Sequence, residues 1–272
     1  MSENKISDDE KIAEGQPLVS HLVELRSRIL SSLGAILVLF LPLFYLRNPI
    51  YTYVSAPLKR YLPEGASMIA TGVASPFLTP FKLTLFLAIF AAIPFILHQV
   101  WSFVAPGLYS SEKRIAYPLL ISSVILFYCG MAFAFYVVFP LVFSFFTSVA
   151  PTDVAVMTDI NSYLDFVLKL FFAFGLAFEI PIATMVLVWT GITDVDSLRK
   201  KRPFVIVGCF VFGMLLTPPD VISQILLALP MWLLFEGGII FSKILGIEDG
   251  ASERRDQANR KGESDKGETD RS

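Results

Sequence analysis

The sequence predicts an all-α protein that crosses a membrane several times. Hydrophobic residues make up 54% of the 272-residue chain and aromatic residues 14%, and the mean hydropathy is +0.64. The apolar residues gather into blocks close to the ~20 residues that a helix needs to cross a bilayer. Charged residues concentrate in the two ends and a few loops, although the formal net charge is only −2. These three observations predict a polytopic bundle of transmembrane helices.

Six apolar blocks mark the expected spans, with uncertain edges, at residues 29–46, 77–97, 117–147, 163–189, 204–217 and 222–241. The third and fourth blocks are long enough to tilt or protrude. The fifth is short and Pro230 interrupts the sixth, so we expect short fifth and sixth helices that thin the bilayer locally or recruit partner helices. The proline-rich loop over residues 47–77 predicts a short interfacial helix and a cap.

The two ends of the chain are polar. Residues 1–20 are acidic and lack the apolar core of a secretory signal, so we expect them to form a cytoplasmic segment. Residues 246–272 alternate acids and bases without apolar content, which predicts a disordered cytoplasmic tail. The transmembrane domain then covers residues 21–245. Cys129 and Cys209 lie inside apolar blocks, which favours small core residues over a disulfide or a metal site.

Lysine and arginine predict the orientation of the spans. Basic residues precede the first span, separate the second from the third, separate the fourth from the fifth, and begin the tail: Lys5, Lys11, Arg26, Arg28, Lys113, Arg114, Arg199, Lys200, Lys201, Arg202 and Lys243. The opposite side carries fewer, namely Arg47, Lys59, Arg60 and Lys82. Both termini are therefore expected in the cytoplasm.

No catalytic motif is visible in the sequence. It contains no H-E-x-x-H, G-x-S-x-G, Walker A or dinucleotide-binding pattern. His21 and His98 lie in different segments at expected helix ends and make a poor metal site. We therefore expect a protein that is not an enzyme, needs no cofactor and binds no nucleic acid.

Two carboxylates stand at the starts of the first and third spans, Glu24 in "HLVELRSR" and Glu112 in "APGLYSSEKR". One interpretation is structural: Glu24 pairs with Arg28 at i,i+4, and Glu112 lies in a first helical turn after Ser110 or Ser111. The other interpretation is a pair of surface carboxylates that receives cationic groups from another chain, because guanidinium–carboxylate contacts can be bidentate and specific. The residues alone leave both open.

A third carboxylate, Glu179, lies inside the apolar stretch "FFAFGLAFEIPIATMVLVW". An ionised group there costs at least a few kcal/mol, and Pro181 leaves the carbonyl near Ala177 without its helical N–H partner. Glu179 is either a protonated acid within the helix packing or a carboxyl that faces a wetted concavity, thins the bilayer and engages a partner helix. We expect the second. Lys169 and Asp165, spaced i,i+4, predict a local ion pair.

Seven segments in order resemble the TatC family, the multispanning component of the twin-arginine protein translocase: "HLVELRSR", "SAPL", "MIATGVASPF", "QVWSFVAPGLYSSEKR", "FGLAFEIP", "LRKKRPF" and "LLTPPDVISQ". The resemblance covers residues 16–245. It implies a concave single-domain bundle in the bacterial inner membrane that binds the twin-arginine signal peptides of folded precursors at its cytoplasmic face. It further implies self-association, contact with membrane lipid, and recruitment of the single-span partners TatB and TatA for export driven by the proton-motive force.

The resemblance also implies roles for single residues. It assigns signal-peptide binding to two carboxylates, Glu24 and Glu112, and to two neighbouring residues, Arg26 and Phe103. Partner helices are received by Met214, Thr217 and Gln224. Three further positions match structural or intramembrane features of the family, namely Pro57 in an external cap, Glu179 in the membrane and Asp220 in the external "PPD" segment.

Two rival classes remain from the residues themselves. A proton-coupled secondary transporter of small solutes would use Glu179, Lys169 and Asp165 as an ion relay. The absence of an internal repeat weighs against many such folds. An intramembrane enzyme is disfavoured because no nucleophile or metal motif is present.

Overall fold

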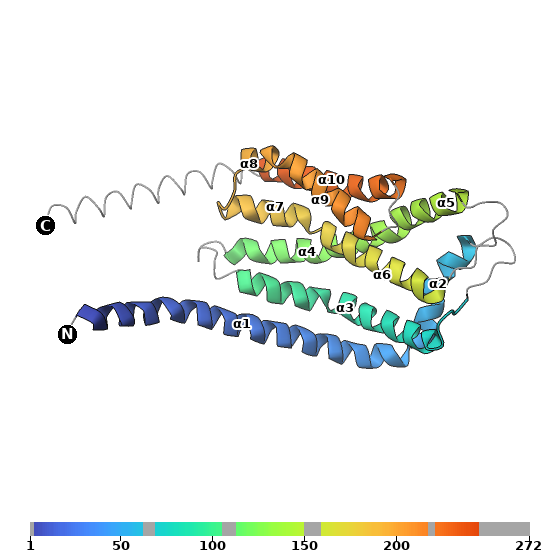
Figure 1. Cartoon of the computed structure of the whole chain (residues 1–272), viewed down its shortest axis with the longest axis horizontal. Coiled ribbons are helices and arrows are strands. Elements are labelled where there is room, and N and C mark those ends of the chain that lie inside the picture. Colours follow the sequence, from blue (N-terminus) through green and yellow to red (C-terminus); the bar gives the residue numbers. More distant parts are fainter. Residues whose placement is uncertain (1–2, 62–68, 105–112, 150–158, 217–220, 245–272) are drawn as a thin grey trace. The chain divides into compact units, whose positions relative to one another are not determined.

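The computed structural model describes residues 3–61, 69–104, 113–149, 159–216 and 221–244, which are helical almost throughout (Figure 1). The elements in chain order are α1 (Glu3–Tyr45), α2 (Arg47–Tyr61), α3 (Ser75–Val104), α4 (Lys113–Phe133), the π-helical turn η3 (Ala134–Val138), α5 (Phe139–Val149), α6 (Ile160–Ala177), α7 (Ile180–Trp189), α8 (Val195–Lys200), α9 (Arg202–Leu216) and α10 (Val221–Ile244). The predicted all-α class is confirmed. The expected short helix after the first span is present as α2.

Five helical segments in the described ranges are long and apolar enough to cross a membrane: Leu22–Tyr45, Ser75–Phe103, Tyr117–Phe146, Ile160–Trp189 and Val221–Ile244. The chain is therefore a multi-pass membrane protein. α9 is also apolar but has 15 residues. At about 1.5 Å per residue it is about 22 Å long, whereas the hydrocarbon core of a bilayer is about 30 Å thick.

The last span is longer than the sequence suggested. α10 is one helix of 24 residues that continues through Pro230. A proline removes one N–H from the helical ladder, and a transmembrane helix tolerates this because neighbouring groups and small local adjustments satisfy the freed carbonyl. Pro230 therefore does not interrupt the sixth span, and only the fifth is short.

The fourth span is broken where the sequence places a proline. α6 ends at Ala177, and the N–H of Glu179 donates to the carbonyl of Leu176 at 3.0 Å, a tightened turn. α7 then starts at Ile180 with Pro181 in its first turn. Proline suits this position because its missing N–H has no helical acceptor there and its fixed φ matches the helix.

The chain forms two compact units. The first comprises residues 1–57 and 72–124. α1 begins at Glu3, so the polar N-terminal residues continue the helix of the first span. α1 packs against α3 through aromatic rings, since the Phe81 ring lies 5.4 Å from that of Phe40 and 5.9 Å from that of Phe44.

The second unit comprises residues 58–71 and 125–272. Its core joins η3, α5, α6 and α10 through buried apolar side chains that include Phe139, Val142, Leu170, Phe174 and Leu227. Glycines allow close helix contacts at two places. A Cβ at Gly130 would come 2.4 Å from the carbonyl oxygen of Phe174, and one at Gly238 would come 2.0 Å from Oγ1 of Thr184. Small residues at such crossings are typical of membrane bundles.

Candidate functional site

Arg28 joins the first and second spans at one end of the first unit. Its Nε and Nη2 donate to Oε1 of Glu24 at 3.0 and 2.5 Å, which confirms the i,i+4 pair expected from the sequence. Its Nη1 also donates to Oε1 of Gln99 at 3.1 Å, and Nη2 donates to the carbonyl of Ser102 at 3.1 Å. The guanidinium thus connects Glu24 on α1 to the last turns of α3.

The predicted signal-peptide residues fall partly on this cluster. Glu24 keeps 38% of its side chain exposed although it is paired, and Arg26 two positions on is exposed. Phe103 is half-buried directly after Ser102. Glu112 lies outside the described residues, so the structure places one of the two carboxylates. Arg28 reaches residues 71 and 74 positions away, and no sequence signal pointed to Gln99 or Ser102.

The face formed by α9 and α10 carries two of the predicted partner-binding residues. Met214 is 52% exposed. Gln224 donates its side-chain N–H to the carbonyl of Phe210 at 2.8 Å, so this amide has an acceptor within the chain. Gly213 allows the close approach, because a Cβ there would lie 3.3 Å from Cγ of Gln224. Thr217 and Asp220 lie outside the described residues, and Pro57 lies within α2.

An ion pair that the sequence did not suggest links the start of α9 to α10. Nη2 of Arg202 donates to Oε2 of Glu236 at 2.6 Å, and 16% of the Glu236 side chain is exposed. Three further polar atoms nearby in these helices are enclosed without a hydrogen bond to the described residues: Nε of Arg202, Oε1 of Glu236 and Nε1 of Trp232. Arg202 belongs to the basic run used for orientation, so composition alone gave no reason to assign it a structural partner.

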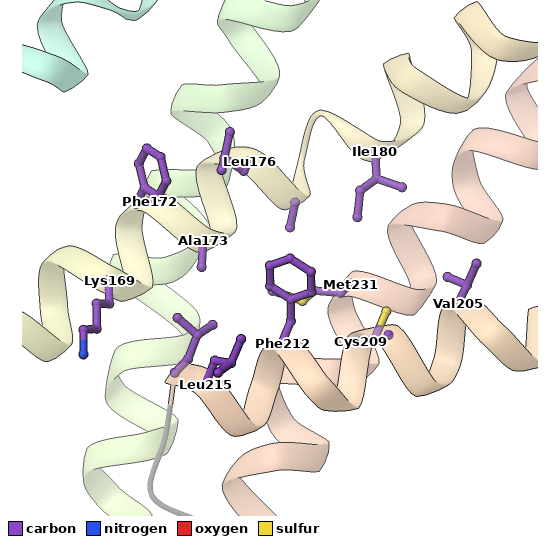
Figure 2. Close-up of a pocket in the computed structure, with 13 residues that line it drawn as sticks. Lys169, Phe172, Ala173, Leu176, Ile180, Val205, Cys209, Phe212, Leu215 and Met231 are labelled. Atoms are coloured by element: carbon purple, nitrogen blue, oxygen red, sulfur yellow. The ribbon is translucent and has the colours of Figure 1, made fainter.

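Glu179 lies at the break between α6 and α7. Its side chain is half-buried and its carbonyl accepts the N–H of Ala183 at 2.8 Å. It does not line the apolar cavity between α6, α7, α9 and α10, although Ala177 before it and Ile180 after it do. Figure 2 shows Ile180 in this lining. The wetted concavity expected at Glu179 therefore stays a prediction.

Lys169 lies at that cavity instead of in an ion pair. Among the described residues that line the cavity, Lys169 is the one that carries a charge, and the others are apolar. In the described part of the chain no ion pair joins Lys169 to Asp165 or to another acid. The expected local pair is therefore absent. The same described residues contain no group of three or more histidines, cysteines and acids that could hold a metal ion.

The start of α6 is fixed by Asp159, just before the span begins. Its carboxylate accepts the N–H and hydroxyl of Thr71 at 3.1 and 2.9 Å and those of Ser162 at 3.0 Å each. The backbone hydrogen bond from Thr71, followed by that from Ser162, lowers the pKa of Asp159 from 3.8 to about 2. An aspartate at this position caps the helix and satisfies N–H groups that have no helical acceptor. It also ties the segment before α3 to the start of α6.

Comparisons with known proteins agree with this architecture. The family model described as Sec-independent protein translocase protein (TatC) matches residues 20–230. A TatC protein of Azotobacter chroococcum mcd 1 is 68% identical over 228 residues, which are 84% of this chain and 89% of the relative. A TatC protein of Escherichia coli K12 is 57% identical over 232 residues, 85% of this chain and 90% of the relative.

A solved structure is similar over most of the fold. The crystal structure described as twin arginine translocase receptor TatC matches with a TM-score of 0.75 and 37% identity, covering 82% of this chain and 98% of that one. The sequence relatives and the solved structure thus agree on one family. The chain belongs to the TatC family of Sec-independent protein translocase subunits.

Proposed function

We propose that this translocase subunit is a receptor and scaffold in the bacterial inner membrane, which binds the twin-arginine signal peptides of folded precursors at its cytoplasmic face. The observation that carries the proposal is the half-exposed carboxylate of Glu24, already held in a guanidinium contact by Arg28. The matching crystal structure is itself described as a twin arginine translocase receptor, which supports the same role here.

The chemistry of the Glu24 site suits an incoming arginine. Among the described residues Glu24 accepts through Oε1 alone, which leaves Oε2 to a second guanidinium. A charged pair that is near water contributes up to about 1 kcal/mol and weakens with salt. Selectivity for two adjacent arginines therefore requires a second acid, for which we propose Glu112. Arg26 and Phe103 flank this site, and Phe103 offers apolar surface to the signal peptide.

The short helix α9 offers a surface to partner helices. α9 is shorter than a bilayer is thick, and its exposed residues Phe204, Val211 and Met214 present apolar surface that a neighbouring helix can cover. We propose that Met214, Thr217 and Gln224 receive the single spans of TatB and TatA, and that copies of the chain self-associate. We propose that Pro57 and Asp220 stabilise the parts of the chain that lie at the opposite face of the membrane.

In this proposal the subunit acts only by binding its precursors and partner helices. It catalyses no reaction, needs no cofactor and binds no nucleic acid. The proton-motive force drives transport by the assembled complex, and the excess of lysine and arginine on one side supports cytoplasmic termini. The cavity beside Lys169 does not support the rival function as a proton-coupled transporter of small solutes, because apart from Lys169 the described lining of the cavity is apolar.

Binding of a twin-arginine signal peptide to the full-length protein in lipid nanodiscs tests the receptor function. Glu24→Gln should weaken binding about fivefold, the factor that corresponds to about 1 kcal/mol, with a smaller loss at high salt. Asp196→Asn is the matched control, because Asp196 also pairs with an arginine, Arg199 at 3.4 Å, but on α8. Equal binding of twin-arginine and twin-lysine peptides by the wild type would contradict the proposal.

A further inference from the structure

An apolar cavity of about 540 Å³ lies between α6, the first turn of α7, α9 and α10 (Figure 2). Its walls include Phe172, Leu176, Ile180, Val205, Phe212 and Met231. Cavities of about 300–1,000 Å³ accommodate small molecules. Because these helices lie in the membrane, the occupant of such a space has to be apolar.

One end of the cavity is charged. Lys169 lines it there, is exposed, and forms no ion pair with the described residues. Figure 2 shows its amino group on the same side of the cavity as Leu215. Its apolar stem can lie along the helix while its ammonium group reaches toward polar surroundings. An anion at this end would therefore complete the site.

The level of Lys169 in the membrane follows from α9. Lys169 and the last two residues of α9, Leu215 and Leu216, line the same cavity. α9 is about 8 Å shorter than the bilayer core, and a short span is accommodated by local thinning of the bilayer. Headgroups of the leaflet on the Leu216 side thus approach the end of α9, and with it the level of Lys169.

We propose that this cavity binds one acyl chain of a membrane phospholipid whose phosphate contacts Lys169. A phospholipid carries the anion and the apolar chain in one molecule, so a single ligand satisfies both features of the site. A partner helix would fill the apolar space but would leave the ammonium group unpaired unless it placed an acid at that level. The bound lipid would hold the thinned leaflet against α9.

The test uses the full-length protein in liposomes of phosphatidylethanolamine and phosphatidylglycerol that contain a phosphatidylglycerol with a photoreactive group near the end of one chain. Labelled peptides are identified by mass spectrometry. We expect labelling on the walls far from Lys169, around Ile180, Val205 and Cys209. Lys169→Gln should lower this labelling about threefold, as expected for one partly exposed charge contact, and Lys169→Arg should retain it.

A cavity-filling variant provides the second measurement. A Cβ at Gly208, which lines the cavity, meets no atom within 4 Å, so the side chain of Gly208→Phe can start there without a clash at its first atom. It should lower labelling about fivefold or more, because the ring takes the volume that the chain needs. Gly237→Phe is the matched control, since Gly237 also has no atom within 4 Å of a Cβ and does not line the cavity.

Three results would overturn the proposal. Equal labelling of wild type and Gly208→Phe, with unfolding midpoints that match, would show that only bulk lipid had been labelled. Equal labelling of wild type and Lys169→Gln would exclude a contact between the lipid phosphate and Lys169. Labelling that is lost when single-span partners are co-reconstituted, together with a crosslink from Phe212→Cys to such a partner, would assign the cavity to a protein helix.

Discussion

The guanidinium of Arg28 donates two hydrogen bonds to the same oxygen of Glu24, Oε1, through Nε at 3.0 Å and Nη2 at 2.5 Å. Nη1 of Arg28 donates to Oε1 of Gln99, and Nη2 also donates to the carbonyl of Ser102, both on α3. The carboxylate proposed to receive a signal peptide is therefore positioned by a second helix. Changes at Arg28 should affect the geometry of the site as well as its charge.

Arg28→Lys should loosen the junction between α1 and α3 while keeping the positive charge. Lysine has a single ammonium and cannot reproduce the planar, four-contact geometry. We expect hydrogen exchange of the peptide that contains residues 99–104 to rise about fivefold, which corresponds to about 1 kcal/mol for contacts that are partly exposed. Arg26→Lys, on an exposed neighbour, should leave exchange unchanged. Equal exchange in the two variants would show that the contacts do not order α3.

Gly238→Ala should destabilise the second unit. The added methyl would lie 2.0 Å from Oγ1 of Thr184 and 2.9 Å from Cα of Pro181, so α7 and α10 would have to separate. Overpacking of this kind costs about 1–3 kcal/mol. The unfolding midpoint in detergent micelles should fall accordingly.

The neighbouring glycine is the control for that change. A Cβ at Gly237 meets nothing within 4 Å, and alanine favours a helix by up to about 1 kcal/mol over glycine. Gly237→Ala should therefore keep or raise the midpoint. A midpoint that falls equally in both variants would indicate that helix contact at Gly238 is not the cause.

The features of the fold that depend on local sequence pattern could be predicted from the sequence. The helical class and the Glu24–Arg28 pair follow from hydropathy and i,i+4 spacing, and Pro181, noted for its missing N–H, lies where the fourth span breaks. Prediction failed where the outcome depends on tertiary contacts. Pro230 is accommodated within α10, and Lys169 lines a cavity beside α9 in place of pairing with Asp165.

Contacts between distant segments could not be predicted for the same reason. Arg202 and Glu236 are 34 residues apart, and Thr71 and Asp159 are 88 apart. A single sequence states which groups are polar but not which of them the packing of helices brings together. The resemblance to a known family supplied candidate residues, yet it gave no indication of the partners that hold them.

The contact between Asp159 and Thr71 should depend on pH. The folded-state pKa of about 2 lies below the usual 3.8, so the ionised carboxylate stabilises the fold fully above 3.8, and this contribution is lost as the pH falls through about 2. Protection of the Thr71 and Ser162 amides from hydrogen exchange, corrected for the intrinsic rate, should decline in that window. In Asp159→Asn the decline should disappear, because the amide caps the helix without titrating. A decline that persists in this variant would place its origin in another group.

The two members of the ion pair between α9 and α10 should depend on each other for their contribution to stability. Oε2 of Glu236 lies 2.6 Å from Nη2 of Arg202, with 16% and 43% of the respective side chains exposed. Removal of either partner leaves a half-buried charge, so Glu236→Gln and Arg202→Gln should each lower the free energy of unfolding. The combined variant should lose less than the sum of the two, because no unpaired charge remains.

A double-mutant cycle measures that coupling, which we expect to be about 1 kcal/mol for a pair with one side partly in water. Raising the salt concentration should reduce the coupling only slightly, since Glu236 is mostly enclosed. The exposed pair Asp196–Arg199, joined at 3.4 Å within α8, is the control and should show weaker coupling that salt removes. If the losses in free energy of unfolding of the two single variants sum to the loss of the combined variant, the Arg202 and Glu236 side chains act independently. Apolar packing alone would then hold the start of α9 against α10.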